Sequence, residues 1–237
     1  MAHWYWRKDT FEGLDELAGL LSERDAELES YAQYCRLREK GLRQESLEAL
    51  AVFLRVIQNW PLDKKVEFVD WLLTLVLDHH FRDSTRVFLP HPLVEGFIRP
   101  TLEDWTKAMP EDGMPHRWKG LYFHDINALR RAVELSPDDR LARISLIYRH
   151  VGFVDYAIHH LPHGYIGDAE EDLQLLAETY ALFEGLEEDD DVANLREELI
   201  GLERVVELWI GYRETGKEMP FHKYCEERGF DSRPYVR

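Results

Sequence analysis

The chain has 237 residues, of which 45% are hydrophobic and 12% are aromatic. This content is too high for an intrinsically disordered chain, and two cysteines are too few for a disulfide scaffold. The 29 Lys and Arg against 46 Asp and Glu give a net charge of −17, which excludes a general binder of nucleic-acid phosphates.

The sequence predicts no membrane or secretory segment. The longest strongly apolar run, residues 71–77, is about a third of the roughly 20 residues that span a bilayer. The N-terminus carries its charges after its aromatic residues and has no apolar h-region, unlike a secretory signal. We therefore expect a cytoplasmic protein with reduced cysteines and no membrane partner.

Helical periodicity dominates the whole chain. Leu50, Leu54 and Ile57, for example, recur on one helical face. Such spacing predicts an all-α fold of antiparallel helix pairs, either an α-α superhelix or an irregular helical bundle. The expected helices lie near 10–21, 23–40, 42–59, 62–80, 92–108, 118–135, 138–161, 169–186, 192–215 and 220–228.

Local signals predict several helix ends. Ser136 followed by Pro137 is typical of a helix start with Ser136 as the N-cap, and Asp168 is a second candidate N-cap. Gly41 is expected to close the second helix. Residues 86–89 are the best candidate for a strand, although this run is short.

Prolines concentrate in one region of the chain. Five of the ten lie between residues 81 and 116. This region is the candidate seam between an N-terminal helical unit, 1–80, and a C-terminal one, 117–237. Because neither half is flanked by a linker rich in Gly and Ser, we expect a single helical domain over 1–237.

Two helix ends carry part of a known repeat signature. The matching positions are Ala49, Phe53, Val56 and Pro61 in one helix, and Leu129, Ala132 and Pro137 in another. Their spacing resembles the second helix of tetratricopeptide repeats, where small residues let paired helices approach and proline ends the helix. The Trp, Leu-Gly and Tyr signature of the first helix is absent upstream of both prolines. The resemblance implies packed helix pairs of a protein-binding module.

Catalytic signatures are incomplete. Residues 211–218 match seven of the eight positions of a phosphate-binding P-loop, but the last is an acid where Ser or Thr would bind magnesium. His79, His80 and the pair His124-Asp125 resemble the sites of HD-type metal phosphohydrolases. Asp125 can instead cap the helix that follows it. We therefore predict no catalytic residue, no cofactor and no metal site.

The densest group of polar and aromatic side chains surrounds a predicted helix end at 155–168. Asp155 and His159 are one turn apart, which allows a hydrogen bond. A loop with Pro and Gly then leads into the next helix, and loops on rigid scaffolds often carry function. The predicted binding residues are Asp155, Tyr156, His159, His160, His163, Tyr165 and Asp168. The alternative is a purely structural helix end and turn.

Acidic residues concentrate in one segment, 168–191. It contains 11 Asp and Glu and no Lys or Arg, so it carries −11 of the net charge of −17. One interpretation is a solvated connection between helices, whose acids also favour the start of the next helix. The other interpretation is a docking face for a basic partner.

Three functional hypotheses follow from these patterns. The first is a non-enzymatic helical module that binds a protein partner. The second is an acidic inhibitor or immunity-type protein that neutralises a basic partner. The third is a metal-dependent hydrolase that uses the histidines. The sequence leaves open the oligomeric state, and whether Trp4, Tyr5 and Trp6 anchor the N-terminus in the core or form a contact patch.

Overall fold

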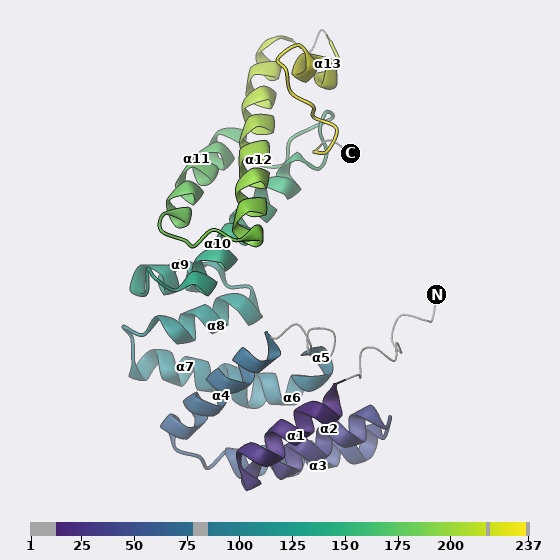
Figure 1. Ribbon diagram of the computed structural model, residues 1–237, viewed down its shortest axis with the longest axis vertical. Coiled ribbons are helices and arrows are strands. Elements are labelled where there is room, and N and C mark those ends of the chain that lie inside the picture. The colour runs from purple at the N-terminus through teal and green to yellow at the C-terminus, as the bar shows by residue number, and fades with distance from the viewer. Residues whose placement is uncertain (1–12, 78–84, 217–218, 236–237) are drawn as a thin grey trace. The chain divides into compact units, whose positions relative to one another are not determined.

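The computed structural model describes residues 13–77, 85–216 and 219–235, and every regular element in these ranges is helical (Figure 1). The predicted all-α fold of packed helices is therefore confirmed. No helix within the same ranges is both long and apolar enough to cross a membrane. Trp4, Tyr5 and Trp6 lie outside the described residues.

The chain divides into two compact units, residues 1–118 (unit 1) and 119–237 (unit 2). The boundary falls within α8 (Gly113–Phe123), just beyond the proline-rich region 81–116. Whether the two units fold as one domain stays a prediction.

Unit 1 begins with three helices that pack side by side (Figure 1). The π-helical turn η4 continues α6 and runs into α7 without a break. The elements are α1 (Leu14–Arg24), η2 (Ala26–Leu28), α2 (Glu29–Glu39), α3 (Arg43–Ile57), α4 (Leu62–Val76), α5 (Thr85–Phe88), α6 (His91–Leu93), η4 (Val94–Ile98) and α7 (Arg99–Ala108).

Aromatic side chains form the core of unit 1. Phe53 of α3 stacks on Tyr31 of α2 with ring centroids 4.8 Å apart, and it meets Phe68 of α4 edge to face at 5.8 Å. The buried hydroxyl of Tyr31 donates to the backbone carbonyl of Phe88, at the end of α5. The segment 86–89, the best candidate for a strand, is no strand, because it lies against α2 as a short helix and its turn.

Unit 2 is built around three longer helices. Its elements are α9 (Ile126–Leu135), α10 (Arg140–Ile158), α11 (Ala169–Tyr180), η5 (Ala181–Phe183), α12 (Asp190–Glu214) and α13 (Phe221–Glu226). Figure 1 shows α11 beside α12, and both pack on α10. The fully buried Val154, Leu176 and Leu199 supply one core residue from each of these helices.

The predicted helix ends are partly correct. Asp168 caps α11 by accepting hydrogen bonds from the first turn, and Gly41 closes α2 with a φ of 77°. Ser136, however, ends α9 rather than starting the next helix. Asp139 caps α10 instead, since its carboxylate accepts from the backbone N–H of Ala142 at 3.0 Å.

The continuous helix expected over 118–135 is also wrong. His124 adopts the left-handed φ of 58°, which few residues other than glycine tolerate, and Asp125 then caps α9. The chain folds back so that α9 contacts α8 closely. A Cβ on Gly120 would lie 2.3 Å from Cγ of Leu129, so only glycine fits at this contact.

Neither of the two partial motifs gains support from the fold. Ala49 and Phe53 are buried, but Val56 at the third position of the tetratricopeptide pattern is 39% exposed. The repeat stays a prediction. Residues 211–214 of the P-loop-like stretch lie inside α12, so they form no loop.

His150 is a buried polar residue in α10. Its Nδ1 lies 2.8 Å from Oγ1 of Thr179, whose hydroxyl donates its proton to the carbonyl of Leu175 at 2.7 Å. The His150 Nδ1 must therefore donate, which leaves Nε2 as a buried acceptor without a hydrogen-bond partner among the described residues. Burial, helped by the positive charge of Arg130, lowers the pKa of His150 to about 4.

We expect the free energy of unfolding to decrease as the pH falls from about 6.5 to about 4. The unfolded chain protonates His150 near pH 6.5, whereas the folded chain does so only near pH 4. The contribution is complete above pH 6.5, and its loss reaches up to about 3 kcal/mol across this window. Urea titrations at pH 7 and pH 5 measure it. His150→Gln should reduce this loss of stability, whereas the exposed control His159→Gln should not. Equal losses in the two variants would contradict the protonation of His150 as the cause.

Candidate functional site

The residues predicted as a binding site lie at the C-terminal end of α10 and in the loop that leads to α11. Six are exposed, namely Asp155, Tyr156, His159, His160, His163 and Asp168. The rings of His159 and His160 meet edge to face with centroids 5.5 Å apart. Asp155 and His159 are both described, and they form no hydrogen bond with each other, contrary to expectation.

Two of the predicted residues have structural contacts. The Tyr165 hydroxyl donates to Oδ2 of Asp172 at 2.7 Å, and burial together with this carboxylate raises the pKa of Tyr165. The backbone N–H groups that Asp168 accepts at the start of α11 lower its pKa. The backbone N–H of Ile166 donates to the carbonyl of Ala157 at 2.9 Å. The residues of the predicted site near α11 therefore fix the loop in place, whereas those at the end of α10 remain exposed.

The exposed part of α10 extends further than the sequence predicted. Tyr148, Phe153 and Tyr156 are 53%, 50% and 65% exposed, and we call these three residues the aromatic face of α10. An exposed group of large aromatic side chains marks a binding surface more often than scattered apolar residues do. Apolar residues occur on several sides of α10, so the sequence alone does not show that Val154 faces inward and that these three residues face outward.

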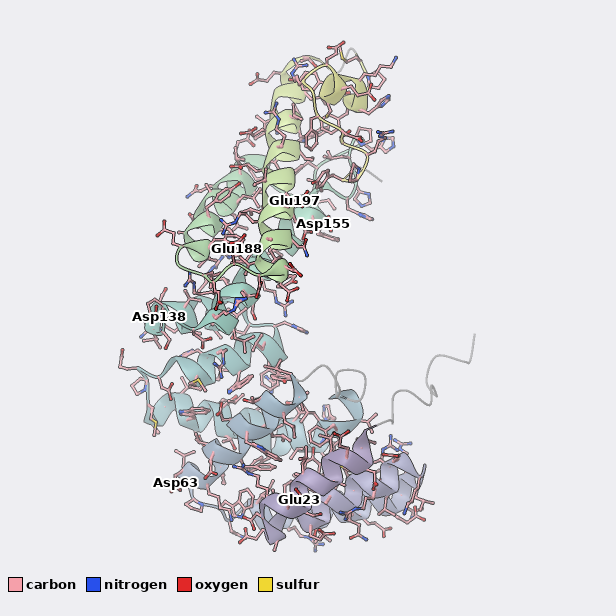
Figure 2. All side chains as sticks on the ribbon, viewed as in Figure 1. Glu23, Asp63, Asp138, Asp155, Glu188 and Glu197 are labelled. Atoms are coloured by element: carbon pink, nitrogen blue, oxygen red, sulfur yellow. The ribbon has the colours of Figure 1, made fainter. Side chains whose placement is uncertain are left out.

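Carboxylates border the aromatic face on the side of α12. Figure 2 shows Asp155 on α10 and Glu197 on α12. Partial burial and the negative charge of Asp155 raise the pKa of Glu198, so these carboxylates lie close enough to repel each other. We call Asp155, Glu197 and Glu198 the acidic rim. No ion pair within the described residues involves any of the three.

Comparisons with protein-family models, with curated proteins and with solved structures find no match to this chain. The assignment of a site therefore depends on the exposure, charge and packing of its own residues.

The histidines proposed for metal chemistry do not gather within the described residues. His79 and His80 lie outside them. His124 is hydrogen-bonded to the guanidinium of Arg149, and Asp125 uses its carboxylate to cap α9, accepting from a backbone N–H at 3.0 Å. No group of three or more His, Cys, Asp or Glu in the described part of the chain is placed to hold a metal ion.

The acidic segment 168–191 covers α11, η5 and the start of α12. Unit 2 contains 25 Asp and Glu and 14 Lys and Arg; the segment holds 11 of these acids and none of the bases, so the rest of unit 2 has 14 of each. Some of the acids pair with arginines, as Glu188 (labelled in Figure 2) does with Arg196 at 3.1 Å. Other acids are exposed and have no ion pair among the described residues, and Glu187, Asp190 and Asp191 are three of these.

Unit 1 contains a hollow of 560 Å³ between η2 and α4. Its buried floor includes Trp60, over whose ring the Lys64 ammonium lies at 4.4 Å. Lys64 also pairs with Asp25 at 3.2 Å, and Arg24 pairs with Glu67 at 2.8 Å. Because both cations that line the hollow are already paired with carboxylates, a charged ligand would have to break existing contacts. We therefore place the candidate site on α10.

Proposed function

We propose that this chain is a helical protein-binding module whose contact surface is the aromatic face of α10. The observation that best supports this proposal is the exposure of Tyr148, Phe153 and Tyr156 on one helix. Removal of apolar surface from water against a partner is a main driving force of protein association. Tyrosine is also among the residues that dominate the binding energy of protein interfaces.

A second function, neutralisation of a basic partner by an acidic inhibitor, is supported by a different observation. The whole acidic excess of unit 2 lies in the segment 168–191. Such a concentrated negative field speeds the encounter with a basic protein and makes binding sensitive to salt. This second function uses Glu187, Asp190 and Asp191, whereas the first uses α10.

Replacing Tyr148, Phe153 and Tyr156 together by Ser should strongly reduce capture of the partner by the immobilised full-length chain. We expect at least a tenfold loss, because interface aromatic residues often contribute about 2 kcal/mol or more each. Capture from a lysate of the cells that make the protein, compared between variants by quantitative mass spectrometry, measures the loss.

The matched control is Ile200→Ser, because Ile200 is 53% exposed in the same unit and lies roughly opposite Glu198 on α12. A third variant carries Glu187→Gln, Asp190→Asn and Asp191→Asn. Loss of capture with the serine variant alone supports the binding module. Loss with the third variant alone supports the inhibitor, and equal capture by every variant contradicts both.

A further inference from the structure

Gly152 lies within the aromatic face of α10, and the fold does not require a glycine at this position. It lies in the helix interior, its φ is not positive, and a Cβ built on it would have no atom within 4 Å. Glycine in a helix interior is less stable than alanine, because it loses more conformational freedom on folding. Neither backbone geometry nor packing within the chain therefore requires this glycine.

The missing side chain leaves a gap in a row of aromatic rings. Tyr148, Gly152 and Tyr156 are spaced four residues apart, so they lie in one row along α10. Both tyrosines are more than half exposed. A gap between side chains four residues before and after it has the shape into which an apolar side chain of a second helix inserts.

The charge beside this gap indicates what accompanies the apolar side chain. Asp155 lies next to Tyr156 on the exposed side of α10, and Glu198 of α12 lies within electrostatic range of Asp155. No cation among the described residues pairs with either carboxylate. A Lys or Arg from outside the chain would relieve this repulsion, whereas an acidic group would increase it.

From these observations, and resting on the function proposed above, we propose that the row Tyr148–Gly152–Tyr156 binds a basic amphipathic segment of a partner protein. An apolar side chain of the segment fills the gap over Gly152, between the two tyrosine rings. A neighbouring Lys or Arg of the segment pairs with the acidic rim.

Gly152→Gln separates this role from a structural one, because the two properties change in opposite directions. The thermal midpoint should rise by about 2–4 °C, since the new side chain has free space and favours the helix. Binding of the partner segment should weaken roughly tenfold or more, because the gap is filled. Gly19→Gln is the matched control, as Gly19 lies inside α1 with equally free space. It should raise the midpoint and leave binding unchanged.

The segment itself can be identified with a library of random 14-residue peptides displayed on phage. The library is selected on the full-length chain and depleted on the variant with Ser at positions 148, 153 and 156. We expect the enriched peptides to combine Lys or Arg with apolar residues at helical spacing. The best peptide should bind roughly three- to tenfold more weakly to Asp155→Asn/Glu198→Gln. The peptide should bind to Asp190→Asn/Asp191→Asn as well as to the original chain, because this variant removes two negative charges away from the acidic rim.

The outcomes distinguish this inference from the proposed function. Enriched peptides that depend on the aromatic face but are neutral or acidic overturn the basic partner segment and leave the binding module in place. A peptide that binds Gly152→Gln as tightly as the original chain overturns the role of the gap. Absence of any peptide that depends on the aromatic face overturns both proposals.

Discussion

Replacing Phe53 by Ala should lower the free energy of unfolding by about 4 kcal/mol, since truncation of a buried Phe typically costs 3–5 kcal/mol. Phe53 is fully buried and contacts Tyr31 face to face and both Trp60 and Phe68 edge to face. Its removal leaves a cavity and takes three ring contacts out of the core of unit 1.

Urea unfolding followed by tryptophan fluorescence measures this effect, because six of the seven Trp residues lie in unit 1. Val52→Ala is the control. Val52 is the neighbouring residue on α3 and is 41% exposed, so its truncation should change stability by no more than about 0.5 kcal/mol. A loss below about 1 kcal/mol for Phe53→Ala would contradict the central place of Phe53 in this core.

Replacing Arg143 by Ala should lower the free energy of unfolding by about 3 kcal/mol. The buried Arg143 guanidinium donates from Nε and Nη2 to the carbonyl of Leu182, at 3.0 and 2.7 Å, and from Nη2 to the carbonyl of Glu184. These bonds hold α10 against η5 and the start of the connection to α12. Without the guanidinium, two carbonyls lose charged donors, and hydrogen bonds to charged groups contribute about 1.5–3 kcal/mol.

Arg140→Ala is the control for this prediction. Arg140 is one turn earlier on α10 and also contacts the connection, but through a surface ion pair with Asp189. Its loss should cost no more than about 1 kcal/mol. Hydrogen exchange of the full chain should show faster exchange across 181–189 in Arg143→Ala than in Arg140→Ala. Equal stability and equal exchange in the two variants would mean that the buried bonds contribute nothing.

The sequence predicted those features well that depend only on interactions between residues close together in the chain. Asp168 caps α11 because an aspartate before a helix satisfies free N–H groups without help from the rest of the fold. The cap predicted at Ser136 is wrong because Asp139, three residues later, offers the same kind of cap and starts α10. Asp125 was recognised as a possible cap of the next helix, but the left-handed turn at His124 was not predicted, since no glycine marks it.

The candidate site was predictable only in part. The cluster around His159 was visible as a local concentration of polar and aromatic residues. Tyr148 and Phe153 were not, because their spacing does not distinguish a residue that faces the core from one that faces solvent. Tyr165 belonged to the same cluster in the sequence, yet its hydroxyl is occupied by Asp172. Exposure depends on which neighbours cover a helix, and the order of residues along that helix does not contain this information.

Hydrogen exchange of the full-length chain, with and without its captured partner or the best selected peptide, tests the place of binding most directly. We expect slower exchange in residues 145–158 of α10 and no change in α3 (Arg43–Ile57), which also carries exposed apolar side chains. Slower exchange in α3 or around the hollow between η2 and α4, with α10 unchanged, would contradict a binding surface on the aromatic face of α10.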